Sequence, residues 1–375
     1  MVGAYNTPQA KKLATTEIDC VIDAVNGALA SAGLAIEDVD GFNVTSTTQR
    51  YTAREAVMLF GARPSWTGHD IGIPGVIEAA LAISAGLCEV AVIATAQVYA
   101  HRERKNTAPW TRPSNEFVEC WGLFTPAEFA LMARRHMHLY GTTAEQFAEV
   151  AATVRNNGAR HPEACHYGKF VTPDDVLNSR MIADPFRLFD CCMENDGACA
   201  VVITTEERAQ DLARAKGRRP VKVVATEQGA PKGYSFGSFT NANIDDEIYA
   251  TGGTEEMANR LWQKADLKPE DVDVAQIYDH FTGSVLMQFE DFGFCKRGEG
   301  GDFIDSGALS VDGGSLPTNT SGGSLSEAYM HGLNHVLEGA RSLWGESCNN
   351  VDNAEVCLVT SAAGVPSSAI LLQAS

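Results

Sequence analysis

Two polar segments in the second half of the sequence carry residue types that can move protons. Tyr278, Asp279 and His280 follow directly after an apolar run that begins at Val272. Phenol, carboxyl and imidazole groups can all act as general acids or bases, and in open α/β sheets ligands bind beyond the carboxyl ends of strands. If the run is a strand, these side chains lie where a ligand would bind. A capped turn with a core tyrosine has the same spacing, so both interpretations stay open.

The second segment is a loop rich in Gly, Ser and Thr, residues 316–335, which leads into a predicted helix. Glycines allow backbone N–H groups to approach a ligand closely. The end of this loop also gathers Tyr329, His331, Asn334 and His335, which a bare linker would not need. A flexible surface loop is the alternative interpretation.

A third polar segment precedes the apolar residues 199–204 and contains Cys191 and Cys192. These thiols could be reactive, but cysteines beside a turn are more often small buried hydrophobic residues. Residues 161–166, His-Pro-Glu-Ala-Cys-His, offer possible metal ligands. Since no second Cys/His cluster at a useful spacing completes a site, we expect no bound metal.

The elements that must position these residues occur twice along the chain. Apolar residues at helical spacing from Ile18 onward predict an amphipathic helix that ends at Gly33, followed by a turn and a strand up to Val44. A helix from Glu255, followed by residues 265–278, repeats this order, and Glu-Asp-Val-Asp occurs in both copies.

A further helix and buried strand, residues 75–96, has its counterpart at 335–364. Two units in the same order indicate an internal duplication, and the near-continuous apolar strands indicate sheets covered by helices on both faces. We therefore predict a duplicated α/β/α/β/α layered sandwich, with an N-terminal half over residues 1–225 and a C-terminal half over residues 226–375. Residues 99–184 are predicted to be a loop insertion that forms a lid or partner surface.

Composition excludes several classes of function. The chain carries 29 Lys+Arg against 48 Asp+Glu, a net charge of −19, which disfavours binding to nucleic acid or to anionic lipid. No apolar stretch is long enough to span a membrane, and the N-terminus has no signal-peptide pattern, so we expect a cytoplasmic protein. The fingerprints of dinucleotide-binding, P-loop, zincin and α/β-hydrolase proteins are absent from the sequence.

The duplicated architecture and the three polar segments together resemble the thiolase superfamily. Tyr278-Asp-His-Phe lies where sterol-carrier-protein-type thiolases carry His-Asp-Cys-Phe. Asn319-Thr-Ser-Gly-Gly lies where they carry Asn-Pro-Ser-Gly-Gly, which is followed by Gly-His-Pro. The resemblance covers almost the whole chain and implies a thiolase-like fold.

The departures from the thiolase pattern concern the nucleophile. A thiolase places its acyl-accepting Cys at the start of the helix before the strand at 90–96, but residues 68–75 contain no Cys. The histidine of Gly-His-Pro is replaced by Tyr329, and residues 361–366, where a thiolase has its second catalytic Cys, are Ser-Ala-Ala-Gly-Val-Pro. Without either thiolate, acyl transfer through a covalent intermediate cannot proceed.

This pattern is similar to that of the lipid-transfer-protein-like aldolases of steroid side-chain degradation, and the strings YDHFT and LPTNTSGGSLSEAYMHG carry the likeness. The resemblance implies a steroid acyl-CoA with a tertiary hydroxyl β to the thioester. A retro-aldol reaction would cleave it into a 17-keto steroid and a short acyl-CoA such as propionyl-CoA. A thioester can itself accept the electrons of the broken bond if donors stabilise its enolate. We therefore expect no cofactor beyond the CoA of the substrate.

The family uses two active-site tyrosines, which the resemblance assigns to Tyr329 and, with a looser match, Tyr234. A phenol acts as a base only if a neighbour lowers its pKa from about 10, and His280, Tyr278 or His331 could do so. The candidate catalytic residues are thus Tyr329, Tyr234, Tyr278 and His280. The candidate substrate-binding residues are His69, His331, Gly322, Gly323 and Asn319.

The resemblance also implies partners. Family members work with a small OB-fold protein, sometimes fused to a hydratase, and thiolase-like chains pair as homodimers across a sheet edge. Together these features predict a two-plus-two assembly. The clusters at 102–105 and 134–135 and Arg155 are candidates for the CoA phosphates, although a solvated charged face explains them equally well.

Two rival functions stay open at this point. One is a non-catalytic carrier of acyl-CoA or lipid. The other is a thiolase or acyltransferase that uses a different cysteine, such as Cys88, Cys120 or Cys192.

Overall fold

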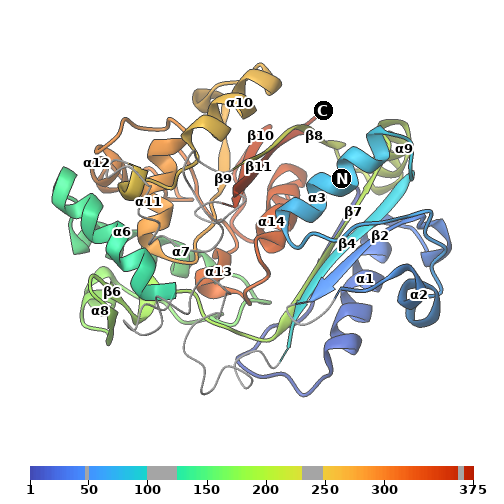
Figure 1. The fold of residues 1–375 in the computed structure, drawn as a ribbon, viewed down its shortest axis with the longest axis horizontal. Helices are drawn as coiled ribbons and strands as arrows, with labels where there is room; N and C mark the ends of the chain where they lie inside the picture. Colours follow the sequence, from blue (N-terminus) through green and yellow to red (C-terminus); the bar gives the residue numbers. More distant parts are fainter. Residues whose placement is uncertain (47–49, 99–124, 230–247, 362–366) are drawn as a thin grey trace.

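The computed structural model describes residues 1–46, 50–98, 125–229, 248–361 and 367–375. Its two larger β-sheets lie on either side of a pair of helices, and further helices cover their outer faces (Figure 1). The structure thus has the predicted layered α/β architecture.

The first sheet combines parallel and antiparallel neighbours. β2 is parallel to β4 and to the short edge strand β3, while β7 is antiparallel to both β4 and β1. All residues of β4 are buried, as expected for a strand with helices on both faces. In spatial order the strands are β1 (Gly3–Asn6), β7 (Gly197–Thr204), β4 (Val90–Gln97), β2 (Gly41–Ser46) and β3 (Trp66–Thr67).

The second sheet repeats the pattern of the first four of these strands, and among the described residues it has no counterpart of β3. β9 is parallel to β10, and β11 is antiparallel to both β10 and β8. In spatial order the strands are β8 (Val221–Gly229), β11 (Ser367–Ala374), β10 (Val356–Ser361) and β9 (Val274–Gln276). β9, β10, β11 and β8 therefore correspond to β2, β4, β7 and β1, as an internal duplication requires. The boundary predicted after residue 225 falls inside β8, whose pairing with β11 places the strand in the second repeat.

Each repeat contributes one outer and one central helix. The outer helices α1 (Glu17–Ala32) and α10 (Glu255–Ala265) each lead through a 3₁₀ turn into β2 or β9. The central helices α3 (Ile73–Ser84) and α14 (Leu333–Trp344) contact strands of both sheets. α1 ends at Gly33 as predicted, because this residue adopts the left-handed conformation at φ 75° that glycine tolerates best.

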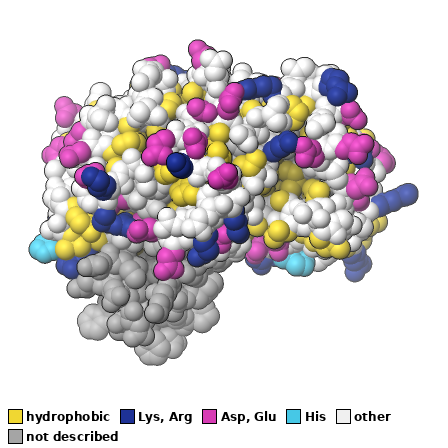
Figure 2. Space-filling model, turned by 90° about the horizontal axis from the view of Figure 1, so that it is seen from above, with side chains coloured by type: hydrophobic (Ala, Val, Ile, Leu, Met, Phe, Trp, Pro, Cys, Tyr) yellow, Lys and Arg dark blue, Asp and Glu magenta, His cyan; other side chains and the backbone are white. Residues whose placement is uncertain are grey.

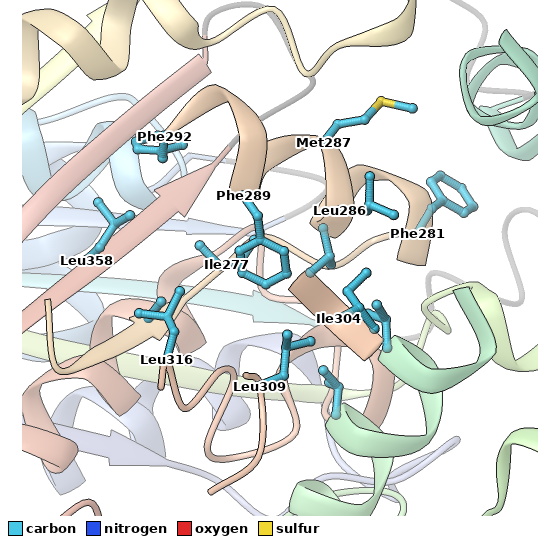
Figure 3. Close-up of a cluster of buried hydrophobic side chains, with 14 of the residues drawn as sticks. Ile277, Phe281, Leu286, Met287, Phe289, Phe292, Ile304, Leu309, Leu316 and Leu358 are labelled. Carbon is cyan, nitrogen blue, oxygen red and sulfur yellow. The ribbon is translucent and has the colours of Figure 1, made fainter. Parts of the chain in front are cut away.

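The layers bury separate hydrophobic clusters. One cluster fills the space between the sheets, and includes Ile73, Leu337 and Leu372. A second lies between α1 and the first sheet. The third covers the outer face of the second sheet, where Ile277, which follows β9, lies beside Phe289 (Figure 3). The outer helices α1 and α10 and the central helices α3 and α14 therefore each pack an apolar face on a sheet.

The predicted insertion is more helical than its sequence indicated. Its described part contains α6 (Thr125–Tyr140), α7 (Ala144–Ala159) and α8 (Pro173–Leu177), where a loop insertion was expected. α7 is largely buried and contacts α11 and α13. It therefore belongs to the body of the protein rather than to a surface loop.

Short elements complete the described chain. They are α2 (Ala53–Glu55), a π-helical turn (Ala56–Phe60), β5 (Met181–Ala183), β6 (Phe186–Arg187), α9 (Glu206–Lys216), α11 (Thr282–Asp291), α12 (Gly300–Asp305), α13 (Gly323–Ser326) and the 3₁₀ turns Ile36–Asp38, Leu188–Asp190, Ile248–Ala250 and Pro269–Asp271. Within the described ranges, no helix combines the length and apolar character that crossing a membrane requires.

Candidate active site

Three parts of the chain meet beyond the carboxyl end of β9: the start of α3, the segment that follows β9, and the loop before α14. A Cβ atom built on Gly72 would lie 1.9 Å from the carbonyl oxygen of His331, so only glycine fits there. A Cβ atom on Gly332 would lie 3.3 Å from Ile73 and 3.5 Å from Tyr278. The two polar segments singled out in the sequence are therefore close neighbours.

The start of α3 lies at this meeting point without a side-chain cap. The first turn of a helix has backbone N–H groups without intrahelical partners and carries the positive end of the helix dipole. This is the region in which the resemblance to thiolases places the nucleophile, and residues 68–75 contain no cysteine. The turn offers electrostatic stabilisation of a negative oxygen, but no thiol.

Two phenols form the centre of the site. The hydroxyl groups of Tyr278 and Tyr329 are hydrogen-bonded to each other. Tyr278 is buried and Tyr329 half-buried. Burial, and then the interaction with Tyr329, raises the pKa of Tyr278 well above its ordinary value. Tyr278 therefore stays protonated and can donate its hydroxyl proton in the hydrogen bond to Tyr329.

The backbone around Tyr278 is fixed by side chains from the second repeat. Its N–H donates to Thr360 Oγ1 at 3.1 Å, and its carbonyl oxygen accepts from Gln288 Nε2 at 2.8 Å. Thr360 in turn donates to Gln288 Oε1 at 2.6 Å. This closed set of hydrogen bonds orients Tyr278 toward Tyr329.

His280 completes the site as a neutral imidazole. Its ring centroid lies 5.0 Å from that of Tyr278 and 4.2 Å from that of Phe129 on α6. Burial lowers the pKa of His280 to about 3, so the ring carries no charge at neutral pH. An effect of His280 on a neighbouring phenol would therefore come from a hydrogen bond and not from a positive charge. Neither ring nitrogen has a hydrogen-bond partner among the described residues, which leaves both available to a ligand.

His331 lies on the other side of Tyr329. The two ring centroids are 4.6 Å apart, and His331 adopts a left-handed backbone conformation at φ 51°. Such a conformation is uncommon for a residue with a side chain and is typical of functional loops. His331 thus lies beside Tyr329, and the substrate-binding role expected for it stays a prediction.

Asn319 binds the protein itself rather than facing a ligand. It is fully buried, accepts from the Ile277 N–H at 2.7 Å and donates to the Ile277 carbonyl oxygen at 2.8 Å. This pair of bonds fixes the start of the segment that carries Tyr278. Asn319 thus has a structural role in the described chain, and the substrate-binding role expected for it stays a prediction.

The two glycines expected to bind substrate are also used internally. A Cβ atom on Gly322 would lie 2.4 Å from Gly158, so Gly322 allows α13 to approach α7 closely. One on Gly323 would lie 2.3 Å from the carboxylate of Asp279, which accepts the next two backbone N–H groups at 2.8 and 3.2 Å and contacts His335 Nε2 at 3.0 Å. The backbone N–H groups of Ser324 and Leu325 therefore bind Asp279, and the substrate-binding roles expected for Gly322 and Gly323 stay predictions.

Other candidates have no described contact with the tyrosine pair. His69 is exposed, and its backbone N–H donates to Glu78 Oε2 at 2.9 Å. Arg155 is buried and donates to the carbonyl oxygens of Phe189 and Cys191 at 2.9 and 3.0 Å, so it cannot serve the CoA phosphates. Tyr234 lies outside the described residues.

The surface shows no continuous cationic patch on the face drawn in Figure 2. Among the side chains coloured there, Lys and Arg are interspersed with Asp and Glu. Arg134, one of the proposed phosphate ligands, lies 3.7 Å from Asp184, and both side chains are exposed. Residues 102–105 lie outside the described residues, so the position of the CoA phosphates stays a prediction.

The thiols considered as alternative nucleophiles are poorly suited to that role. Burial raises the pKa of Cys88 to about 11 and raises that of Cys192 well above its ordinary value. A thiol in this state is protonated at neutral pH and is a weak nucleophile. Cys120 lies outside the described residues. Within the described part of the chain, no three His, Cys, Asp or Glu side chains form a group that could hold a metal ion.

Comparisons with known proteins agree with this fold. Residues 239–372 match the family model described as "Thiolase C-terminal domain-like". The fold is also similar to that of a monomeric SCP2-thiolase-like protein type 1 from Mycobacterium smegmatis, with a TM-score of 0.71 at 15% identity over 99% of this chain and 76% of that one. The fold and the site define a thiolase-like protein in which the nucleophilic cysteine is missing.

More similar relatives narrow the class. The 17-hydroxy-3-oxo-4-pregnene-20-carboxyl-CoA lyase of Mycobacterium tuberculosis is 40% identical over 99% of this chain and 98% of its own length. The steroid side-chain-cleaving aldolase of Thermomonospora curvata is 36% identical over 100% of this chain and 97% of its own length. A solved structure named "Ltp2-ChsH2(DUF35) aldolase" has a TM-score of 0.89 at 35% identity, covering 100% of this chain and 97% of that one. The chain belongs to the steroid side-chain-cleaving aldolases of the thiolase superfamily.

Proposed function

We propose that this enzyme catalyses retro-aldol cleavage of a steroid acyl-CoA that carries a hydroxyl group at C17, β to the thioester. The products are a 17-keto steroid and propionyl-CoA or a similar short acyl-CoA. The full-length relatives support the reaction, since their names specify steroid side-chain cleavage and a 17-hydroxy carboxyl-CoA lyase. The observation that carries the assignment is the pair of hydrogen-bonded phenols in a thiolase-like site without the nucleophilic cysteine.

Tyr329 is the proton-transfer residue in this proposal. Its ionised phenol takes the proton of the substrate hydroxyl, the C–C bond between the carbinol carbon and the α-carbon breaks, and the electron pair moves into the thioester as an enolate. Tyr329 then returns this proton to the α-carbon, which releases the short acyl-CoA and restores the phenolate. Tyr278, whose pKa burial raises, is the donor that stabilises the Tyr329 phenolate. Tyr234 is retained as a second candidate phenol on the strength of the resemblance alone.

The enolate oxygen faces the first turn of α3 and His280 in this mechanism. An uncapped helix N-terminus and a neutral imidazole N–H both stabilise developing negative charge without giving up a proton. The low pKa of His280, about 3, suits such a donor because the ring stays neutral. His331 contacts the substrate beside Tyr329. No cofactor is required beyond the CoA of the substrate, because the thioester itself receives the electrons.

The assembly we propose contains two copies of this chain and two copies of a small partner. The exposed apolar side chains of Val57, Met58 and Leu59 lie on the turn just before the open edge strand β3, and exposed Leu87 is adjacent. Such a patch favours pairing of two chains across this edge. The partner proposal rests on the name of the solved aldolase, which includes a DUF35 component. We place the assembly in the cytoplasm, in keeping with the free thiols of the described residues.

The test is product analysis with a 17-hydroxy steroid acyl-CoA. We expect the wild-type chain, with and without its small partner, to release equimolar ketone and short acyl-CoA. Tyr329→Phe should lower kcat by about 10²–10⁴-fold with little change in substrate binding, the usual range for loss of a general acid–base group. Tyr167→Phe, at an exposed position, is the control and should match the wild type. Substrate binding without cleavage by the wild-type complex would instead indicate a carrier.

A further inference from the structure

A buried carboxylate lies just before Tyr329 in the chain. Glu327 directly follows α13 and is 1% exposed. It is not one of the two hydrogen-bonded tyrosines at the centre of the site. Burying a charged group is costly unless donors surround it. Its partners therefore indicate what the carboxylate does in the fold.

The donors to Glu327 come from both repeats. Oε1 accepts from Asn6 Nδ2 at 3.1 Å and from Gln9 Nε2 at 3.5 Å, both near the N-terminus of the chain. Oε2 accepts from Ser321 Oγ at 3.0 Å and from Asn334 Nδ2 at 2.8 Å, on either side of the loop in the second repeat. Glu327 therefore joins β1 and its following turn to the start of α14.

A histidine side chain also lies beside the carboxylate of Glu327. His161, at the end of α7, places Nδ1 3.5 Å from Glu327 Oε1. Burial opposes the charged form of His161, but its hydrogen bond to Glu163 and the charge of Glu327 outweigh burial and raise its pKa. The carboxylate thus connects three layers of the structure: the first sheet, α7 and the loop before α14.

The backbone next to Glu327 is held by the same groups. Gln9 Oε1 accepts the N–H of Ala328, and Asn195 Nδ2 donates to the carbonyl oxygen of Glu327 at 3.4 Å. Tyr329 directly follows Ala328 in the chain. The position of its Cα atom is therefore set by the contacts of Glu327 and Ala328. A shift of about 1 Å in such a group is enough to lower turnover strongly.

We propose that Glu327 is a positioning residue, whose negative charge gathers donors from both repeats and thereby holds the Tyr329 hydroxyl against Tyr278. This inference rests on the proposed role of Tyr329 in proton transfer. The charge matters because both oxygens of a carboxylate accept hydrogen bonds. A glutamine side chain at position 327 would instead place an NH₂ group, which is a donor, against two of the donors that now bind Glu327. Leaving such buried donors unpaired costs free energy and displaces the loop.

Glu327→Gln tests the proposal, and Glu338→Gln is the matched control. Glu338 is also a buried acid of the second repeat and accepts from Thr320 and Ser347. We expect Glu327→Gln to lower kcat about tenfold or more with KM changed less than about twofold, whereas Glu338→Gln keeps both values within about twofold of the wild type. Equal losses of kcat in the two variants at equal losses of Tm would overturn the proposal.

A double-mutant cycle separates positioning from general stability. In a Tyr329→Phe background, Glu327→Gln should lower kcat by less than about twofold, because the group it positions is already gone. A full tenfold loss in that background would overturn the proposal. If Glu327→Gln does not unfold cooperatively, Asn6→Ala takes its place in the cycle, because it removes one donor to Glu327. Its loss of kcat should likewise be smaller in the Tyr329→Phe background than in the wild type.

Failure of the proposed function gives a different result. If the wild-type chain releases no ketone, or if Tyr329→Phe keeps full turnover, the role of Tyr329 is wrong and positioning by Glu327 falls with it. If the wild type cleaves the substrate and Tyr329→Phe is impaired, while Glu327→Gln matches the wild type, only the positioning role is wrong.

Discussion

Replacing a thiolate by a phenol changes the reactions that a site can support. A thiolate attacks a thioester and forms a covalent intermediate, whereas a phenolate with a pKa nearer neutrality removes a proton. In this site Tyr278 stays protonated because it is buried, and the half-buried Tyr329 is the phenol that a substrate can reach. The division of roles that we propose for the two tyrosines thus follows from their different burial.

The pKa of His280 predicts how stability depends on pH. The ring titrates at about 3 in the folded protein and near 6.5 when unfolded. Between these values the unfolded state binds the additional proton, so stability is retained above about pH 6.5 and lost as the pH falls toward 3. Denaturant unfolding at pH 7 and pH 5 should show a contribution from this group of about 2 kcal/mol, absent in His280→Gln. An equal pH dependence in the two proteins would contradict the buried neutral state.

The sequence was informative about residues that lie close together in the chain. Tyr278 and His280 after β9, and Tyr329 and His331 before α14, were identified from local spacing, and the structure brings them together. The roles of Asn319 and the adjacent glycines were not recognised, because Gly/Ser loops are expected to bind ligands and the competing acceptor, Asp279, is distant in sequence. Glu327 was missed for the same reason, since Asn6 is far from it along the chain.

At the level of elements, the approach of two helices sets the position of the catalytic loop. Gly158 of α7 lies against Gly322 and Ser326 of α13, and a Cβ atom there would be 2.2 Å from Ser326 Cβ. Gly158→Ala should therefore push α13 away, even though alanine favours helices. We expect a lower Tm and a cost of about 1–3 kcal/mol, as for other overpacked cores, together with a reduced kcat.

Glu149→Ala on the same helix is the control for that variant, because Glu149 is half-buried and far from the glycine contact in sequence. It should change Tm and kcat little. A Gly158→Ala protein with raised Tm and unchanged kcat would show that the two helices have room to spare, and that the contact does not position the loop.

The helix–strand units were predictable from hydrophobic periodicity, and the sheet order confirms the duplication that they indicated. α7 was not predicted because its sequence is dominated by alanine and small polar residues, which give a weak apolar stripe, and because it lies in a stretch with a polar composition. Its burial comes from tertiary contacts with α11 and α13. Such contacts leave no local pattern in the sequence.

At the scale of the whole molecule, the open edge of β3 makes a prediction about assembly. Met58 is 68% exposed beside this edge. Met58→Glu places a charge in the proposed contact between two chains and should convert dimers into monomers in sedimentation experiments. Phe170→Glu is the control, because Phe170 is 62% exposed but precedes α8, on the opposite side of the molecule from α2 (Figure 1). A dimer that withstands Met58→Glu but is lost in Phe170→Glu would place the contact elsewhere.

The most direct test of the account is the mass of the intact chain during turnover. The assembly is mixed with a 17-hydroxy steroid acyl-CoA, quenched in acid at successive times, and analysed by mass spectrometry alongside the released products. We predict that ketone and short acyl-CoA accumulate together while the chain keeps its unmodified mass, because phenols transfer protons and no sulfur is acylated. An acyl adduct on a cysteine that forms and decays at the rate of turnover would contradict this account.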